Sequence, residues 1–342
     1  YDRDFARRVL ERGADIGATR LGVSGMSDDF ALVAAQMAER DCYTNPNGLD
    51  SLRQALVERC AAEGLTGLTR DHVQVTAGGT GAIHTLFSTW LSPGDEVLLM
   101  APFWPIVRGI VHACGGVPVE VPFYEGLRAG KSVAELVAPY LSERTVALYV
   151  TSPNNPCGTV LTPAQVFEVA AFCVQNDLWA LADEAYHHYV YEGEHTWLAN
   201  QPGMAERTAT VFTVSKSYAL AGSRVGFLVG DPSWLEASRR VMTQTIYHVP
   251  TIAQLAAKAA IGQGAAWVAE TREIYREAAA FTSRTLQAPH APAEEEQRRH
   301  DERHEHHDHE REPRARGHEH HERAHERDGL MDALAAAAHL HR

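Results

Sequence analysis

Short apolar runs alternate with segments of helical periodicity along most of the chain. The runs rich in Val, Ile, Leu and aromatic residues predict buried strands at 72–79, 95–100, 116–123, 144–153, 178–185, 209–216 and 224–230. Apolar residues at helical spacing predict helices within 49–64, 80–91, 104–116, 163–176, 232–262 and 265–288. Buried strands that alternate with helices predict an α/β fold, with a mostly parallel sheet flanked by helices on both faces.

This pattern stops at about residue 289. Residues 289–328 contain almost no apolar side chains and hold most of the 19 histidines of the chain, mixed with Glu and Arg. Because such a segment buries too little apolar surface to offset its chain entropy, we expect 289–342 to be a disordered or partly helical tail. A metal-binding tail is the alternative interpretation, since two histidine pairs have helical spacing, His304 with His307 and His318 with His321.

The composition of the tail suggests a further hypothesis about its origin. Its bias towards Ala, Arg, His, Pro and Glu is typical of a shifted reading frame in GC-rich DNA, so we expect an altered frame or another truncation. A naturally divergent end is the alternative. At the other end the chain begins with Tyr1 rather than Met, and we expect some N-terminal sequence to be missing.

Length, charge and cysteine content narrow the class of protein. The 342 residues suggest two lobes, and the 45 % of hydrophobic residues suffice for a sizeable core. A formal net charge of -13 argues against non-specific nucleic-acid binding. Five scattered cysteines without a CxxC pair favour a reducing, cytoplasmic setting. Neither a signal peptide nor an apolar run of membrane-spanning length is visible, so we expect no membrane partner.

Polar residues follow the predicted strands at their carboxyl ends, where open α/β sheets bind ligands. The segment TAGGTGA (76–82) ends one strand and opens a helix, so the amides of Gly79 and Thr80 are expected to face an anion. Asn155 follows the next long strand. Asp183 ends a strand that is otherwise apolar, where a carboxylate is costly to bury without a cation.

Lys216 stands at another strand end, between hydroxyl residues and followed by an arginine. A lysine amine that faces such an anion cradle suits a phosphorylated aldehyde, with which it forms a Schiff base. We therefore predict pyridoxal 5′-phosphate as the cofactor. The phosphate is expected to contact Thr213, Ser215, Arg224 and the Gly79–Thr80 amides. The ring is expected to contact Asp183 at its nitrogen, Asn155 and Tyr186 at its phenolic oxygen, and Trp104 on its face.

Taken together, the motifs resemble those of the class I/II aminotransferases, which are fold type I pyridoxal-phosphate enzymes similar to aspartate aminotransferase. The segments that carry the resemblance are 43–56, 76–82, 102–105, 154–159, 182–186 and 215–227, and the resemblance covers roughly 20–288. It implies Lys216 as the Schiff-base lysine and proton shuttle. It also implies that Tyr43 reaches the phosphate of a neighbouring subunit, and hence a homodimer with shared active sites.

The chain also departs from the family pattern. The family's small domain carries an arginine for the substrate's α-carboxylate, and no apolar strand near Arg298, Arg303, Arg314 or Arg316 is available to fix one. We therefore expect an incomplete small domain. The loop 20–30 resembles the family's substrate loop without its proline, which leaves Gly25 as a candidate substrate contact beside Asn155.

The resemblance implies a division of the chain and a reaction. Residues 1–42 are expected to contribute to the small domain, 43–262 to form the large cofactor-binding domain, and 263–288 to form a connecting helix. The expected reaction moves an amino group between an amino acid and a 2-oxo acid, without a metal ion in the site. The alternatives are another reaction of the same cofactor (lyase, cyclase or oxidative deaminase) and a truncated copy that binds cofactor without turnover.

Overall fold

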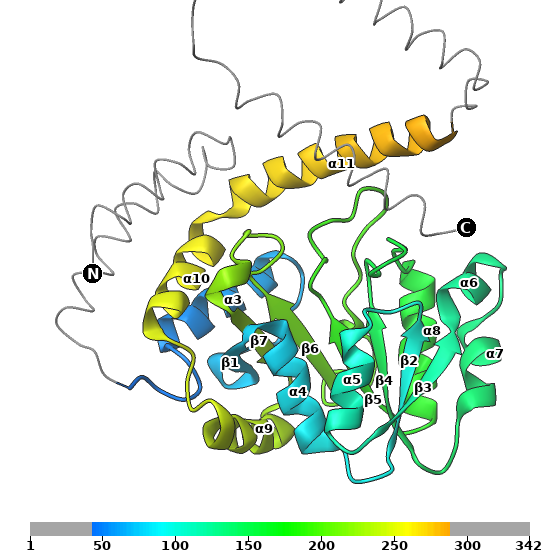
Figure 1. The fold of residues 1–342 in the computed structure, drawn as a ribbon, viewed down its shortest axis with the longest axis horizontal. Coiled ribbons are helices and arrows are strands. Elements are labelled where there is room, and N and C mark those ends of the chain that lie inside the picture. The colour runs from blue at the N-terminus through cyan, green and yellow to red at the C-terminus, as the bar shows by residue number, and fades with distance from the viewer. Residues whose placement is uncertain (1–42, 288–342) are drawn as a thin grey trace, which may run out of the picture. The chain divides into compact units, whose positions relative to one another are not determined.

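A computed structural model of the chain describes residues 43–287, and its central feature is a seven-stranded sheet (Figure 1). The strands are β1 (Val73–Ala77), β2 (Glu96–Ala101), β3 (Val117–Pro122), β4 (Thr145–Thr151), β5 (Trp179–Asp183), β6 (Thr208–Thr213) and β7 (Val225–Val229). Their order across the sheet is β1-β7-β6-β5-β4-β2-β3. Only β7 among them pairs antiparallel with its neighbours, β1 and β6, and all other pairs are parallel.

Helices connect strands β1 to β5 in succession, whereas loops with short 3₁₀ turns join β5 to β6 and β6 to β7. The described α-helices are α3 (Asp50–Ala62), α4 (Gly78–Trp90), α5 (Ile106–Ala113), α6 (Phe123–Arg128), α7 (Val133–Val137), α8 (Pro163–Gln175), α9 (Pro232–Thr245), α10 (Thr251–Gln263) and α11 (Ala265–Gln287). Short 3₁₀ turns lie at Arg70–His72, Ala138–Tyr140, Leu198–Asn200 and Ala221–Ser223. The chain divides into two compact units, Tyr1–Ala280 and Phe281–Arg342, and the second is described only through the end of α11.

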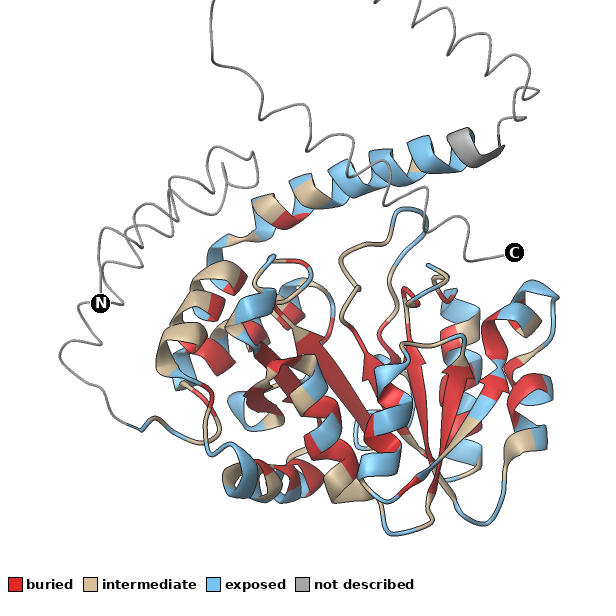
Figure 2. Ribbon diagram, viewed as in Figure 1, coloured by how far each residue is buried: buried red, intermediate tan, exposed pale blue. Residues whose placement is uncertain are grey.

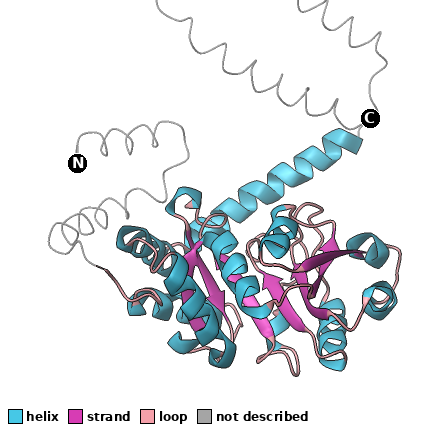
Figure 3. Cartoon of the chain, turned by 60° about the horizontal axis from the view of Figure 1, so that its bottom comes forward, coloured by secondary structure: helices cyan, strands magenta, loops and turns pink. Residues whose placement is uncertain are grey.

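Strands β1, β2 and β4 to β7 are buried on both faces, where successive side chains point to opposite sides of the sheet, whereas the edge strand β3 is largely exposed. In β2, Val97 and Leu99 pack with α4, α5 and α9 on one face, whereas Leu98 and Met100 pack with α6, α7 and α8 on the other. Helices α3 and α10 cover the second face of β1, β6 and β7. Figure 2 shows the buried strands in red, and Figure 3 shows helices on both sides of the sheet. The predicted α/β architecture is thereby confirmed.

This topology brings several chain segments to one edge of the sheet. The strands β1 to β6 run in one direction and all end there, and the antiparallel β7 begins there. The segments that follow these strands and the residue that precedes β7 therefore lie at a common edge of the sheet, which is where open α/β sheets bind ligands.

Each predicted strand is present, and its ends agree with the structure within three residues. Several predicted strands extend two or three residues beyond the observed carboxyl end, because the polar residues that follow the strand lie in a loop. The helical pattern over 232–262 forms two helices, separated by a loop in which Tyr247 has a φ of 69° and Pro250 precedes α10. Helix α6 was not predicted.

Some predictions fall outside the described residues. These are the substrate contact at Gly25, the role of residues 1–42, and the disorder, metal binding and origin of the 289–342 tail. Within residues 43–287, no helix combines the length and the apolarity that crossing a lipid bilayer requires.

Candidate active site

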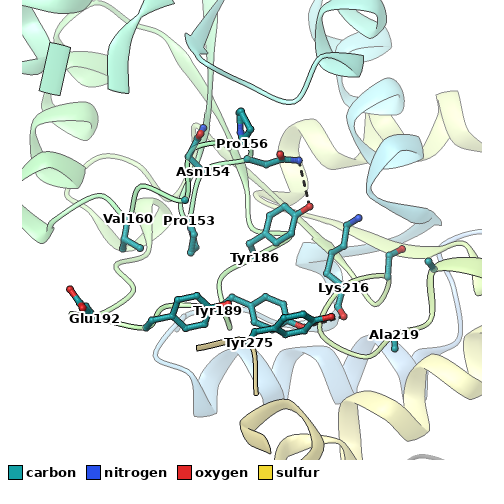
Figure 4. Close-up of a pocket in the computed structure, with 15 residues that line it drawn as sticks. Pro153, Asn154, Pro156, Val160, Tyr186, Tyr189, Glu192, Lys216, Ala219 and Tyr275 are labelled. Carbon is teal, nitrogen blue, oxygen red and sulfur yellow. Dashed lines mark hydrogen bonds between the residues drawn. The ribbon is translucent and has the colours of Figure 1, made fainter. Parts of the chain in front are cut away.

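A pocket of about 1060 Å³ opens at the carboxyl edge of the sheet (Figure 4). Its walls come from the loops after β4, β5 and β6 and from α11. The lining includes four residues that the sequence singled out, which are Asn155, Tyr186, Ser215 and Lys216. The structure thus brings together residues that lie up to 61 positions apart in the chain, as counted from Asn155 to Lys216.

Lys216 and Tyr186 lie beside each other in this pocket. Nζ of Lys216 is 5.8 Å from the centre of the Tyr186 ring. The amide of Asn155 donates a long hydrogen bond of 3.5 Å to the hydroxyl of Tyr186, drawn as a dashed line in Figure 4. Lys216 is exposed. A flexible amine next to an amide and a phenol can attack a carbonyl carbon and move protons within the pocket.

The start of α4 lies next to this pocket and has the geometry that suits an anion. The first backbone N–H groups of a helix have no partner within it, and here they belong to Gly78, Gly79 and Thr80. Gly78 has a φ of 73°, and a Cβ on it would lie 2.5 Å from Nη2 of Arg224. A Cβ on Gly79 would lie 3.7 Å from Cβ of Thr213. The guanidinium and the threonine therefore both lie against the unpaired amides.

The loop between β6 and β7 has a local conformation that positions Thr213, Ser215 and Arg224. The hydroxyl of Thr213 donates to Oγ of Ser215 at 2.8 Å, and the backbone N–H of Ser215 donates to the Thr213 hydroxyl at 3.1 Å. Arg224 has left-handed backbone angles, with φ 52° and ψ 46°. That conformation is costly for a residue other than glycine, and such strain is concentrated at functional sites. The predicted phosphate ligands are therefore brought together.

We expect Gly226→Ala to displace the start of α4, where the unpaired amides lie, and to destabilise the protein. A Cβ on Gly226 would lie 2.4 Å from the carbonyl carbon of Gly78 and 2.6 Å from the nitrogen of Gly79, so strand β7 or the start of α4 must shift. Overpacking of this kind costs about 1–3 kcal/mol, and thermal unfolding should show a lower midpoint. Gly222→Ala is the matched control, since its Cβ would meet open space. Equal midpoints for the two variants would contradict this account of the close approach.

Asp183 is a buried carboxylate at the end of β5, with only 9 % of its surface exposed. It accepts hydrogen bonds from the hydroxyl of Tyr149 at 2.8 Å and from the backbone N–H of Ala185 at 3.2 Å. Burial raises the pKa of Asp183 to about 6, although these two hydrogen bonds and the charge of Lys216 act in the opposite direction. Among the described residues, no Lys, Arg or His forms an ion pair with it. The carboxylate is thus suited to a cationic group of a bound ligand.

This raised pKa predicts a pH dependence of stability in the ligand-free protein. The unfolded chain has the ordinary Asp pKa of 3.8, so the stability that protonated Asp183 contributes is present below about pH 4 and is lost as the pH rises through about 6. Relative to Asp183→Asn, the wild-type chain should lose on the order of 2 to 3 kcal/mol between pH 4 and 7. Urea unfolding of both proteins across this range measures the difference. A difference that stays constant with pH would argue against a raised pKa.

The remaining predicted residues lie around the site rather than in its lining. Trp104 is half-buried and packs against the core between α4, α5 and the sheet, three residues after β2 ends. Tyr43 is 81 % exposed, and its ring contacts Tyr247 and His248 edge to face, with centroids 5.1 and 5.6 Å away. Neither lines the pocket.

Sequence reasoning missed three tyrosines of the site. Tyr149 supports Asp183 from β4, and Tyr189 and Tyr275 line the pocket, with their rings edge to face at 5.5 Å. Tyr149 had a signal, because it is the polar member of the apolar run ALYV and lies on the same face of the sheet as Asp183. Tyr275 had none, because it reaches the pocket only through the placement of α11.

Comparison with known proteins places this site in context. The profile of the family described as aminotransferase class I and II matches residues 19–298. A probable aspartate/prephenate aminotransferase of Thermus aquaticus is 36 % identical, over 68 % of this chain and 61 % of its own length. The arginine–pyruvate transaminase AruH of Pseudomonas aeruginosa is 34 % identical, over 78 % of this chain and 69 % of its own.

Solved structures agree with these relatives. The aspartate aminotransferase of Thermus thermophilus, solved with maleate, superposes with a TM-score of 0.68 at 33 % identity, covering 73 % of this chain and 66 % of that one. The chain described here therefore shares the fold of that enzyme. It spans less than two thirds of the Thermus aquaticus relative's length.

Proposed function

The chain belongs to the class I and II aminotransferase family, and from this premise we propose that it is a pyridoxal 5′-phosphate-dependent aminotransferase that moves an amino group between an amino acid and a 2-oxo acid. One observation supports this most directly. A free lysine amine, a helix-start anion cradle and a buried carboxylate without a cation converge at one edge of the sheet. A phosphorylated aldehyde with a protonated ring nitrogen complements all three.

The residues present fit this cofactor. The unpaired amides of Gly79 and Thr80, with Arg224, Thr213 and Ser215, would hold its phosphate. Asp183 would meet the ring nitrogen, and Tyr149 would keep that carboxylate in place. Asn155 and Tyr186, already in contact, would share the ring's phenolic oxygen, and Trp104 would lie against the ring face.

When bound, pyridoxal phosphate supplies an electron-accepting ring that stabilises negative charge at the substrate's α-carbon. Lys216 would hold the cofactor through Nζ and, once displaced by substrate, remove the proton from the α-carbon. The ammonium of Lys216 would then give that proton to the aldehyde-derived carbon of the cofactor. Asp183 would keep a proton on the ring nitrogen, because its negative charge in a buried setting is best balanced by a cation. Tyr186 would keep the phenolic oxygen hydrogen-bonded throughout.

We propose further that residues 43–262 form the cofactor-binding domain and that two chains share their active sites. The high exposure of Tyr43, at the start of the described chain, supports a role for its hydroxyl in a neighbouring subunit. In mixed dimers of Tyr43→Phe and Lys216→Ala chains, one site should regain both residues and with them about a quarter to a half of the activity per dimer. A monomer at micromolar concentration with full cofactor affinity would contradict shared sites.

A cytoplasmic location is supported by the free state of all four cysteines within residues 43–287.

The test of the activity is a half-reaction followed by absorbance. Protein loaded with cofactor is mixed with single amino acids chosen as acidic, aromatic and basic. Bleaching of the visible cofactor band by an amino acid, and its return on addition of a 2-oxo acid, is the expected result. Release of ammonia would instead indicate another reaction on the same scaffold. A band unchanged by every amino acid would indicate a copy that binds cofactor without turnover.

A further inference from the structure

Three side chains outside the pocket converge where α3 meets the loop after β5. Glu63 follows α3 directly, and His187 and His188 follow Tyr186. Nε2 of His187 lies 3.3 Å from Oε2 of Glu63, and Nε2 of His188 lies 2.9 Å from Oε1. One nitrogen of each ring and one carboxylate oxygen all lie within 4.8 Å of one another. None of the three has a role in the proposed reaction.

The contacts of His187 require a positive charge between its ring and the carboxylate of Glu63. Its Nδ1 lies 2.7 Å from the carbonyl oxygen of Glu184, which can only accept, so Nδ1 must carry a hydrogen. In the neutral ring Nε2 then carries a lone pair and no hydrogen, and it faces a carboxylate oxygen of Glu63. Two acceptors at this distance repel each other unless a positive charge lies between them. Either a proton or a metal ion satisfies that requirement.

The second histidine offers another ring nitrogen to the same carboxylate. Nδ1 of His188 lies 2.8 Å from the hydroxyl of Ser217 and can donate to it, which turns Nε2 towards the same carboxylate. Metal-bound histidines typically donate their other ring N–H to an oxygen in this way, which fixes ring orientation. The rings of His187 and His188 stack with centroids 3.8 Å apart and a tilt of 38°, and the Nε2 atom of each faces the carboxylate of Glu63.

Burial and charge around the cluster are compatible with a cation. The side chains of His187, His188 and Glu63 are 11, 12 and 22 % exposed. A tetrahedral Zn²⁺ ion separates its nitrogen and oxygen ligands by about 3.3 Å, close to the distance from His187 to Glu63. Arg59 lies 3.5 Å from Oε1 of Glu63 and weakens a cation's attraction. The neighbouring His195 and Glu184 pair with each other at 3.2 Å.

We propose that Glu63, His187 and His188 form a binding site for Zn²⁺, with water in the remaining coordination position. The ion would join the end of α3 to the loop that carries Tyr186. Through His188 and Ser217 it would also brace the residue next to Lys216. The site is separate from the proposed cofactor site, and its test does not use amino-group transfer.

The first measurement locates the ion in the unaltered protein. Crystals of the full chain, freed of metal with a chelator and then soaked in Zn²⁺, are examined by anomalous diffraction at the zinc edge. We expect a peak with ligand distances of about 2.0–2.2 Å to Nε2 of both histidines and to the Glu63 carboxylate. Density without such a peak would leave a protonated His187 paired with Glu63 and would refute the site.

The second measurement compares variants of the full chain in solution. Glu63→Gln and His188→Gln should each raise the dissociation constant of this site for Zn²⁺ by about 100-fold or more. They should also abolish the rise in melting temperature that Zn²⁺ produces. His112→Gln is the matched control, because His112 is exposed on α5. All these chains keep the histidines of 289–342, so Zn²⁺ binding that is equal in all of them would assign the ions elsewhere and overturn the proposal.

Discussion

Lys216→Ala is expected to abolish amino-group transfer while leaving the fold intact. The side chain is exposed, so its loss removes no buried contact, and the proposed phosphate ligands Gly79, Thr213 and Arg224 are untouched. The variant should therefore still bind cofactor, without a covalent link. Because one amine both holds the cofactor and moves the proton, turnover should fall by at least roughly 10²–10⁴-fold. Steady-state assays and the visible absorbance of the purified protein measure the two effects.

The chain offers a matched control, since it contains only three lysines, at 131, 216 and 258. Lys258 is exposed on α10, and Lys258→Ala should retain the wild-type spectrum and rate. Borohydride reduction followed by peptide mass analysis should place the cofactor on Lys216. An adduct on Lys131 or Lys258 would overturn the assignment of the active-site lysine and the site built around it.

Asp183→Asn is expected to keep the cofactor bound but to lower turnover by roughly 10²–10³-fold, the usual cost of removing one preorganised electrostatic contact. An amide at this position can accept the hydrogen bond from Tyr149, so the pocket keeps its shape. It carries no negative charge, however, and cannot hold a proton on the ring nitrogen. Cofactor affinity by equilibrium dialysis, measured beside the turnover number, separates binding from catalysis.

Asp177→Asn is the control for this substitution. Asp177 is exposed after α8, with a φ of 52° that asparagine tolerates, and its carboxylate accepts a hydrogen bond from Arg207 at 3.0 Å. Its replacement should leave turnover near the wild-type value. If Asp183→Asn also turned over at nearly the wild-type rate, Asp183 would be a structural carboxylate, and the electron-accepting role of the ring would need another partner.

The strands and the main helices could be predicted from the sequence because the spacing of apolar residues that identifies them is a local property of the chain. A β2 that is apolar at every position from Val97 to Met100 is buried on both faces wherever it lies in the sheet. The short helix α6 escaped prediction, since six residues carry too little periodicity to distinguish a helix from a loop. Whether a strand is parallel or antiparallel is not a local property, and so the reversal of β7 appears only in the structure.

Several of the predicted site residues share one feature, in that they stand where an apolar strand gives way to polar residues. This position identifies Asn155, Asp183, Thr213 and Lys216 without reference to their neighbours in space. It does not supply their roles, which remain predictions, nor does it reveal Tyr149 and Tyr275. Those two act from a strand face and from a distant helix, and their proximity follows from packing.

By itself, then, the sequence determined which residues are chemically capable of the reaction, because side-chain type and strand position are written along the chain. The tertiary structure decided which of them meet. The antiparallel course of β7 places Arg224 against Gly78, and the register of β4 and β5 lets Tyr149 reach Asp183. The convergence of Glu63 with His187 and His188, across 124 and 125 positions of sequence, was likewise decided by the packing of α3 beside the loop after β5. Contacts of this kind depend on the sum of all helix and strand placements, and no single stretch of sequence specifies them.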